Sequence, residues 1–456
     1  MKLQVCVLAA GQGKRMRSAM PKVLHKIAHK ALVEHVLDTA ASLSPGEAPI
    51  VIFGHGGDQL QAALAERQIT WVEQAEQLGT GHAVAQCLPH IAPQGITLIL
   101  YGDVPLTREE TLRQLINEAE TNGFALLTVM MEDPTGYGRI VRDENGTIQA
   151  IVEHKDASAE QLNIREVNTG IMAVSSEFLH ASIPNLSNEN AQGEYYLTDC
   201  VEMAVSADMQ VAGVVAENVV EVTGVNNRRQ LAELERAYQQ SIANDLMDQG
   251  VTLRDPARID VRGDLNCGQD VEIDINTVFS GSVKLGDGVR IGPNCVISDA
   301  VIDDGVEILA DCVIDSAMIG SDARIGPFAR VRPDTKLGQG VHIGNFVEVK
   351  KSEISDGSKV NHLAYVGDSE IGKNVNVGAG TITCNYDGAF KHKTVLEDDV
   401  FIGSDTQLVA PVRVGRGSTV GAGTTVTADV EPDALVVSRV KQKQISGWQR
   451  PRKPGK

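Results

Sequence analysis

The sequence predicts two domains of different fold class, an α/β domain with a mostly parallel sheet and a parallel β-helix. Residues 1–227 alternate short apolar runs with amphipathic stretches, which is the pattern of an α/β domain. After Gly250 an aliphatic residue recurs every five or six positions, which is typical of a parallel β-helix. A helical pattern over 228–250 links the two domains. The β-helix is therefore predicted over 251–437, and a basic tail over 438–456 ends the chain.

The elements of the first domain are predicted from the periodicity of their apolar residues. Unbroken apolar runs at 3–9, 50–53, 97–101 and 126–130 predict strands, and the stretches at 32–41 and 109–119 predict helices between them. Such alternation favours parallel strands joined by helical crossovers.

The segment after residue 227 has the period of a helix and ends at a glycine. Its apolar residues recur at spacings of three and four, and Gly250 follows as a stop signal. This predicts one long linking helix, whose apolar positions are Leu231, Leu234, Tyr238, Ile242 and Leu246.

The repeat of the second domain is regular enough to predict which residues face inward. One aliphatic side chain per short strand fills the narrow interior, and a small residue often follows it. The rhythm breaks between Val377 and Ile402, where residues 385–393 are predicted to loop out from one edge. The inward positions are Leu285, Ile291, Ile297, Ile302, Ile308, Ile314, Ile319, Ile325, Val331, Leu337, Ile343, Val349, Ile354, Val360, Val366, Ile371, Val377, Ile402, Leu408, Val414, Val420 and Val426.

Composition excludes several classes of protein. The 456 residues contain 41 Lys+Arg and 60 Asp+Glu, and this net charge of −19 argues against nucleic acid as a partner. No apolar run reaches the ~18–20 residues of a membrane span, and no signal peptide is visible, so a cytoplasmic protein is expected. The seven cysteines have no C-x-x-C spacing, which predicts free thiols instead of a zinc site or a disulfide framework.

A glycine loop follows the first predicted strand. Residues 8–16 read L-A-A-G-Q-G-K-R-M, and glycines at a strand-to-helix turn let backbone N–H groups approach a phosphate. The dinucleotide fingerprint fails because position 16 is Met, and the P-loop fails because Leu8 and Arg15 stand where Gly and Ser or Thr are needed. With Pro21-Lys22 following, the segment resembles the sugar-nucleotidyltransferase signature. Arg15 and Lys22 are candidates to neutralise triphosphate charge.

Asp103 follows the apolar run 97–101 in the segment Y-G-D-V-P. A carboxylate at the carboxyl end of a parallel strand lies beside the ligand crevice and suits Mg²⁺. The sequence therefore predicts a magnesium ligand here, next to the glycine loop.

Repeat arithmetic predicts a second site on the β-helix. Residues about 18 apart lie on adjacent coils at the sheet spacing of ~4.8 Å, so Arg332 and Lys350 are expected to stack as a clamp for a phosphate. His362 is expected to lie over Ala379, beside the predicted loop. Because histidine titrates near neutral pH, His362 is the candidate base that takes a proton from an attacking amine.

Further motifs extend the resemblance to the whole chain. They are Gln74, Q-L-G-T-G-H at 77–82, Y-G-D at 101–103, G-Y-G-R at 136–139, I-V-E-H-K-D at 151–156, N-T-G at 168–170 and G-V-N-N at 224–227. In this order the chain resembles the family of bifunctional N-acetylglucosamine-1-phosphate uridyltransferases/glucosamine-1-phosphate N-acetyltransferases, which make UDP-N-acetylglucosamine for cell-wall and lipopolysaccharide synthesis. The resemblance implies a Rossmann-like nucleotidyltransferase domain and a left-handed β-helix with three strands per coil.

Residue roles in the first domain follow from that resemblance. Asp103 and Asn226 would hold Mg²⁺, Gly138, Glu153 and Asn168 the sugar and ribose, and Arg15 and Lys22 would assist uridylyl transfer from UTP to N-acetylglucosamine-1-phosphate. The remaining nucleotide- and sugar-binding positions are Leu8, Ala9, Ala10, Gly11, Gln74, Gly79, Thr80, Tyr101 and Gly102.

Roles in the β-helix are implied in the same way. His362 would be the general base for acetyl transfer, and a homotrimer would bind acetyl-CoA between subunits. Glucosamine-1-phosphate would be held by Arg332, Lys350, Tyr365 and Asn376, and acetyl-CoA by Ala379, Asn385, Tyr386, Ser404, Ala422 and Arg439. The basic tail that begins at Arg439 either orders over coenzyme A phosphates or is a solvated, disordered segment.

Two other hypotheses fit parts of the sequence. A different nucleotide-sugar pyrophosphorylase could use the β-helix only for oligomerisation, but the expected register of Arg332, Lys350 and His362 argues against it. A non-catalytic regulatory subunit, as some translation-factor subunits resemble, could dispense with Asp103 and Asn226, which are both present.

Overall fold

The computed structural model describes residues 2–451 and forms two compact units. The first contains Met1–Tyr238 and the second Gln239–Lys456. The boundary lies inside helix α7 (Arg228–Asp248), where the periodicity predicts a linking helix. The sequence prediction also separates a linking helix (228–250) and a basic tail (438–456) from the two domains. The division into two units does not test these limits, which stay predictions.

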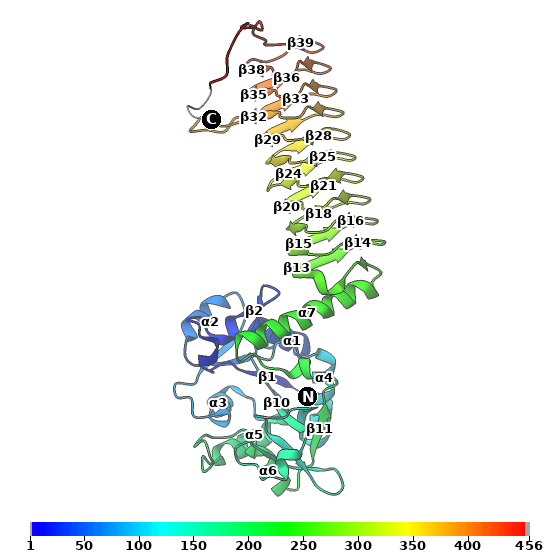
Figure 1. Cartoon of the computed structure of the whole chain (residues 1–456). Helices are drawn as coiled ribbons and strands as arrows, with labels where there is room; N and C mark the ends of the chain where they lie inside the picture. The colour runs from blue at the N-terminus through cyan, green and yellow to red at the C-terminus, as the bar shows by residue number, and fades with distance from the viewer. Residues whose placement is uncertain (1, 452–456) are drawn as a thin grey trace. The chain divides into compact units, whose positions relative to one another are not determined.

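Unit 1 is an α/β fold around a mixed sheet with strand order β11-β7-β10-β6-β1-β4-β5 (Figure 1). Neighbours β6, β1, β4 and β5 are parallel, as are β7 and β11, whereas β10 runs antiparallel to both β6 and β7. The predicted parallel arrangement is therefore confirmed for most of this path. The exceptions are β10 and the β8–β9 hairpin, which pairs antiparallel with β10 in the same sheet. The strands of unit 1 are β1 (Leu3–Leu8), β2 (Lys26–Ile27), β3 (Lys30–Ala31), β4 (Ile50–Phe53), β5 (Thr70–Glu73), β6 (Ile96–Tyr101), β7 (Phe124–Met130), β8 (Arg139–Arg142), β9 (Ile148–Val152), β10 (Glu166–Ser175) and β11 (Val211–Val215).

Helices cover both faces of this sheet. Alternate residues of β1 point to opposite faces, so Val5 and Val7 pack with α1 and α4, while Cys6 and Leu8 pack with α3 and α6. These two aliphatic cores fix the carboxyl ends of β1 and β6, where the predicted loops begin. The helices are α1 (Leu32–Leu43), α2 (Gly57–Ala63), α3 (Thr80–Cys87), α4 (Glu109–Asn122), α5 (Ser176–Ser182) and α6 (Asp199–Ser206).

The glycine loop is followed by less helix than the sequence predicts. Only two 3-10 turns, η1 (Lys14–Met16) and η2 (Lys22–Leu24), form between it and β2, and the backbone of both Gly13 and Arg17, which flank η1, is left-handed. Left-handed residues on both sides of η1 prevent an α-helix from continuing. A long helix N-terminus therefore does not face this loop, and side-chain cations carry its positive charge.

Unit 2 is a parallel β-helix in which three short strands make each coil (Figure 1). One side is an 11-stranded parallel sheet. Its strands are β12 (Thr252–Leu253), β14 (Glu272–Ile273), β16 (Arg290–Ile291), β19 (Glu307–Ile308), β22 (Arg324–Ile325), β25 (His342–Asn345), β28 (Lys359–His362), β31 (Asn376–Val377), β34 (Phe401–Ile402), β37 (Thr419–Val420) and β39 (Leu435–Val436).

The other two sides belong to one 17-stranded sheet that bends around a corner. The long strands β13 (Ile259–Cys267) and β15 (Thr277–Leu285) begin it. One side continues with β17 (Val296–Ser298), β20 (Val313–Asp315), β23 (Arg330–Val331), β26 (Glu348–Lys350), β29 (Tyr365–Gly367), β32 (Ile382–Cys384), β35 (Gln407–Val409) and β38 (Thr425–Val426). The other side holds β18 (Val301–Ile302), β21 (Ala317–Ile319), β24 (Thr335–Leu337), β27 (Glu353–Ile354), β30 (Ser369–Ile371), β33 (Thr394–Leu396) and β36 (Val412–Val414).

The repeat register matches the sequence prediction. Ile325 pairs with Ile343, Ile343 with Val360 and Val360 with Val377, each one coil apart. All four belong to one continuous core of buried aliphatic side chains. One aliphatic residue per strand therefore lies in the interior, as predicted. A second buried row two positions earlier, which includes Val289, Val306 and Val341, shares the interior and was not predicted.

The interruption of the repeat is shorter than the spacing suggests. Strand β32 continues the coil with Thr383 in the inward position, paired with Leu408, and β33 resumes it with Leu396 paired with Ile371. A threonine is small enough for that position and uses its hydroxyl to accept from the backbone N–H of Gly367 at 2.8 Å. Only residues 385–393 leave the coil.

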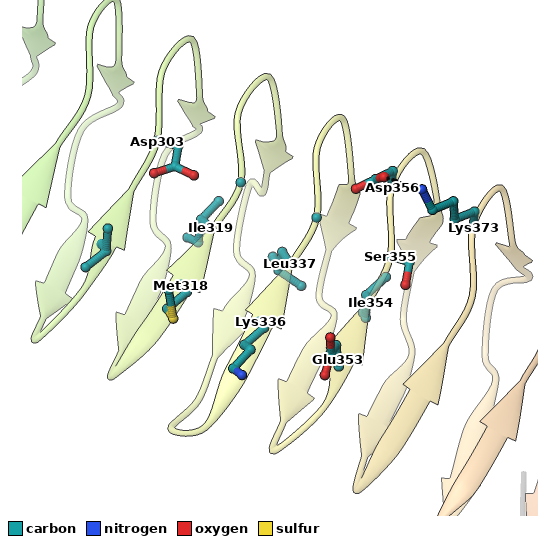
Figure 2. A pocket seen from close by; sticks show the side chains of 13 residues that line it. Asp303, Met318, Ile319, Lys336, Leu337, Glu353, Ile354, Ser355, Asp356 and Lys373 are labelled. Atoms are coloured by element: carbon teal, nitrogen blue, oxygen red, sulfur yellow. Dashed lines mark ion pairs between the residues drawn. The ribbon is translucent and has the colours of Figure 1, made fainter.

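One side of unit 2 carries a shallow groove of about 290 Å³ that contains none of the predicted site residues. Figure 2 shows Met318, Lys336 and Glu353 projecting from successive strands, with Lys373 pointing toward Asp356. Lys373 Nζ lies 2.9 Å from Asp356 Oδ2.

The tail after β39 has neither helix nor strand over 438–451, and residues 452–456 of the predicted basic tail lie outside the described residues.

Candidate active sites

Two adjoining cavities open at the carboxyl ends of β1 and β6 in unit 1. The first, of about 370 Å³, contains most of the predicted nucleotide site, and the second, of about 350 Å³, contains Arg15 and Asn226. Tyr101 and Asp103 line both, so Asp103 lies where the two cavities meet. The predicted residues in the first cavity are Leu8, Ala9, Ala10, Gly11, Lys22, Gln74, Gly79, Thr80, Tyr101 and Asp103.

Gln74 is held rigidly at the wall of the first cavity. Its side chain is buried, and Nε2 donates to the carbonyl of Gly79 at 3.1 Å. Gly79 has φ +113°, and a Cβ there would lie 2.5 Å from the carbonyl oxygen of Tyr195, so only glycine fits this approach. Gln77 also lines the cavity and donates from Nε2 to the Gln74 carbonyl at 3.1 Å. Sequence reasoning placed Gln77 only within a motif and gave it no role.

Charged side chains converge at the junction of the cavities. Lys22 Nζ forms an ion pair with Asp103 Oδ2 and lies 3.4 Å from Asn226 Oδ1. Arg15 Nη2 donates to the same Asn226 oxygen at 3.0 Å. A Cβ on Gly13 would lie 2.7 Å from Lys22 Cβ, so the glycine lets the loop pass close to this lysine. Two cationic side chains and two side-chain oxygens that could ligate a metal thus lie close together, although they are distant in sequence.

Gly138, Glu153 and Asn168 form a separate group. The backbone N–H of Asn168 donates to the Gly138 carbonyl at 2.9 Å, and a Cβ on Gly138 would lie 3.4 Å from Glu153 Oε1. The pKa of Glu153 is raised by burial and then by neighbouring carboxylates, although the hydroxyl of Thr198 donates to it at 3.3 Å. Burial also raises the pKa of Tyr101, with further contributions from Asp103 and Glu153. Tyr101 therefore lies between this group and the charged junction.

His362 lies at the end of β28, at a corner of the β-helix. Its Nδ1 is 2.8 Å from Oδ1 of Asn345 on the preceding coil, in direct register. The carbonyl of His362 accepts from the N–H of Gly380 at 3.3 Å, which places it against the 378–380 backbone of the next coil as predicted. Because the Asn345 oxygen can only accept, Nδ1 carries the proton in this geometry and Nε2 is left as an acceptor. Asn345 was not predicted, since its role depends on the register.

Three cations gather on the adjacent side of the same coils. The backbone N–H of Arg332 donates to the Val349 carbonyl at 2.8 Å, which places Arg332 beside Lys350 as the repeat predicts. Lys391, from the 385–393 loop, lowers the pKa of Lys350, and Arg332 adds to this effect. The Arg332 guanidinium donates to Glu348 Oε1 at 2.7 Å. Lys391 was missed because the repeat does not fix where the loop returns.

Tyr365 and Asn385 lie beside this cation cluster, and Asn376 is one coil further on. A Cβ on Gly367 would lie 2.8 Å from Asn385 Nδ2 and close to the Tyr365 hydroxyl. Gly367 is also the register partner of Lys350, so these side chains share one stretch of surface. Asn376 begins β31 in register with Lys359, on the sheet that carries His362.

The predicted acetyl-CoA residues lie on successive coils above His362. Asp405 N–H donates to the Ala379 carbonyl at 2.7 Å, and Gly423 N–H donates to the Ser404 carbonyl at 2.8 Å, so positions 379, 404 and 422 stack. Arg439 Nη2 reaches the Ala422 carbonyl at 3.5 Å. Tyr386 is exposed in the loop, where its hydroxyl donates to the Gly388 carbonyl at 2.6 Å.

Other kinds of site are not found in the described part of the chain. Residues 2–451 contain no group of three or more His, Cys, Asp or Glu side chains that could hold a metal ion by themselves. All seven cysteines are free thiols, five of them buried and two, Cys267 and Cys384, half-buried. Within the same residues, no helix has the length and apolar character needed to cross a membrane.

Fold and sites together define a transferase with two domains, a nucleotidyltransferase followed by a left-handed β-helix acyltransferase. Residues 5–192 match the MobA-like NTP transferase domain. Residues 265–299, 316–351 and 393–428 match the bacterial transferase hexapeptide repeat.

Curated relatives span the entire chain. The bifunctional protein GlmU of Nitrosospira multiformis is 58% identical over 100% of this chain and 99% of its own. That of Marinobacter nauticus is 58% identical over 99% of both chains, and that of an Azoarcus species is 57% identical over 98% and 99%. The chain belongs to the GlmU family. It is a bifunctional enzyme of UDP-N-acetylglucosamine synthesis, with uridyltransferase and acetyltransferase activities and with nucleotide and acyl-CoA substrates.

Proposed function

We propose that the two activities belong to the two clusters described above. Uridylyl transfer from UTP to N-acetylglucosamine-1-phosphate takes place at Asp103, Lys22, Arg15 and Asn226. Acetyl transfer from acetyl-CoA to glucosamine-1-phosphate takes place at His362. The observation that carries this proposal is that each unit holds its own convergent set of charged residues, with one set suited to phosphoryl transfer and the other to deprotonating an amine.

In the uridylyl site the chain's own residues position and neutralise charge. The glycine loop and Gln74 hold the uridine end of UTP, while Arg15 and Lys22 face the triphosphate. The phosphate oxygen of the sugar attacks the α-phosphorus in line, and pyrophosphate leaves. Such a reaction needs no covalent nucleophile, because positioning and electrostatic stabilisation provide most of the acceleration.

The residues at the junction of the cavities fit a magnesium ion. Asp103 Oδ2 and Asn226 Oδ1 both lie within reach of Lys22 Nζ, so two hard oxygen donors face one small region that now holds a cation. Mg²⁺ is commonly held by one or two carboxylates together with substrate phosphates, which agrees with a cluster too small to bind a metal alone. When bound, Mg²⁺ would neutralise charge on the phosphates.

In the acetyl-transfer site His362 is the base and Asn345 orients it. With Nδ1 donating to Asn345, the free Nε2 takes the proton as the amine attacks the thioester carbonyl. Arg332 and Lys350 bind the phosphate, joined by Tyr365 and Asn376 around the sugar. The stacked positions Ala379, Ser404 and Ala422 offer a surface for acetyl-CoA, together with Asn385, Tyr386 and Arg439.

A homotrimer would complete the acetyl-CoA site between subunits. At one corner of the β-helix the residue on each coil has a positive φ. On two coils nearer the start of the repeat this residue is Asn294 or Asp311, and asparagine and aspartate often adopt this conformation. The next three coils place Phe328, Phe346 and Leu363 there, also with positive φ and about half exposed. Bulky apolar residues are unusual in this conformation, and this exposed ridge next to His362 supports burial against another copy. Sedimentation of the full chain should give a trimer, and a monomer would contradict this assembly.

We place the enzyme in the cytoplasm, where UTP and acetyl-CoA are found.

Glu153 predicts a pH dependence for the first activity. Its pKa is raised by burial and by Asp156, Asp199 and Glu194, so on acidification it gains a proton at a higher pH than an ordinary glutamate. The sugar hydroxyls then lose a charged acceptor, and we expect the KM for N-acetylglucosamine-1-phosphate to rise by about 10-fold. Glu153→Gln should have the high KM at every pH. A wild-type KM that stays constant through the same acid range would contradict this role.

One incubation tests the whole proposal. The full chain is mixed with glucosamine-1-phosphate, acetyl-CoA, UTP and Mg²⁺, and the products are identified by mass. We expect UDP-N-acetylglucosamine, pyrophosphate and free coenzyme A. With EDTA the acetylated sugar phosphate should accumulate and the UDP-sugar should not form. Loss of both products under EDTA would contradict the assignment of the metal to one site.

A further inference from the structure

We propose that Glu221 and Arg108 form a positioning pair for the metal-binding residues of the uridylyl site. This inference rests on the proposed role of Asp103 and Asn226. The pair joins the chain segment that follows Asp103 to the segment that precedes Asn226, and so fixes the separation of the two oxygen donors.

Glu221 is a buried carboxylate with three donors from one residue. It is only 4% exposed, and Arg108 donates to it from the backbone N at 3.1 Å, from Nε at 3.2 Å and from Nη2 at 3.1 Å. The same Nη2 also donates to the exposed Glu217 at 3.1 Å. Nε and Nη2 both donate to Oε2, and the backbone N–H donates to Oε1, so Arg108 as a whole holds both oxygens of the carboxylate and fixes its orientation.

The pair lies between the two segments that carry the donors. Arg108 precedes α4, five residues after Asp103, and Glu221 lies in the 3-10 turn η6 (Val219–Val222), directly before the segment that ends at Asn226. Two further bonds tie the segments together. The Thr107 hydroxyl donates to the Glu221 carbonyl at 3.1 Å, and the Val225 N–H donates to the Asp103 carbonyl at 2.9 Å.

These contacts fit a positioning role better than a simple contribution to stability. The Glu221 side chain is buried but that of Arg108 is 49% exposed, and an ion pair with one solvent-exposed partner adds little net stability, so positioning is the better account of this contact. Hydrogen bonds behind metal ligands commonly change metal affinity by about 10–100-fold when they are removed. Glu221 does not line either cavity, so it acts through the backbone that carries the ligands.

The test uses Glu221→Gln in the full chain, with Mn²⁺ as the probe. The substitution keeps the shape of the side chain and removes its charge. We expect the dissociation constant for Mn²⁺, followed by electron paramagnetic resonance of the free ion, to rise about 10-fold. The Mg²⁺ concentration for half-maximal uridylyl transfer should rise by the same factor, while kcat at saturating Mg²⁺ and acetyl transfer stay near wild type.

Glu109→Gln is the matched control. It removes the glutamate that follows Arg108 in the first turn of α4 and pairs with Arg113 four residues on at the exposed surface, and it should leave the affinity for Mn²⁺ unchanged. If Glu221→Gln does not fold, Arg108→Lys, which keeps the charge but loses the fork, decides the question with an expected rise of about 3–10-fold.

Different results would contradict the positioning role of the pair and the metal site on which it rests. Unchanged Mn²⁺ affinity in a folded Glu221→Gln or Arg108→Lys chain would overturn the positioning role alone. Unchanged Mn²⁺ affinity in Asp103→Ala would instead overturn the metal site and, with it, the proposed uridylyl mechanism.

Discussion

Asp103→Ala is expected to lower the rate of uridylyl transfer by about 10²–10³-fold and to leave acetyl transfer at the wild-type rate. Asp103 lies at the junction of the two cavities and, among residues 2–451, is the only carboxylate that lines both. Its removal takes away the proposed metal ligand and the ion partner of Lys22, so charge on the triphosphate should no longer be balanced at the point of reaction. Measuring both activities on one preparation provides an internal control, because acetyl transfer reports an intact chain.

Two comparisons sharpen this test. Asp143→Ala removes an exposed aspartate that accepts from the backbone N–H groups of Asn145 and Thr147 in the turn between β8 and β9, outside both cavities, so it should leave both activities within about 2-fold. Asp103→Asn keeps the volume and one oxygen donor and should retain more activity than Asp103→Ala. An equal loss of both activities in Asp103→Ala would contradict the assignment to the first unit.

The sequence predicts the parts of the uridylyl site that depend on strand ends. Glycine and aspartate directly after apolar strands are expected to meet at one edge of a parallel sheet, and Gly11 and Asp103 do line the same cavity. The α-helix expected after the glycine loop was wrong, because the left-handed backbone at Gly13 and Arg17 limits it to one turn. Propensity cannot reveal this, since a left-handed arginine is stabilised only by its surroundings.

The repeat of the second unit predicts more, because one period fixes both the core and the stacking. Arg332, Lys350 and His362 are found at the predicted register positions. The repeat period does not predict the path of a loop inserted between two strands. Lys391 reaches Lys350 only because the 385–393 loop folds back, with the His392 N–H donating to the Asn385 carbonyl at 2.8 Å. Asn345 could have been found by counting 17 residues back from His362, which is the same arithmetic applied to the preceding coil.

His362→Ala should lower acetyl transfer by about 10²–10⁴-fold, the usual contribution of a general base, and leave uridylyl transfer unchanged. The reason lies in the geometry of one hydrogen bond: Asn345 Oδ1 accepts from Nδ1–H at 2.8 Å, so the proton stays on Nδ1 and Nε2 is available to the amine. Asn345→Ala should therefore also lower acetyl transfer, by about 10-fold, because the ring is no longer held in one tautomer and one orientation.

His342→Ala is the matched control for both substitutions. His342 lies in β25, the strand that carries Asn345, and pairs in register with Arg324 and Lys359 instead of the acetyl-CoA positions. It should leave acetyl transfer within about 2-fold. Acetylation near the wild-type rate in His362→Ala would refute the base role. A strong loss in His362→Ala with none in Asn345→Ala would support His362 as the base and contradict its orientation by Asn345. The two variants therefore test the proton acceptor and the group that orients it separately.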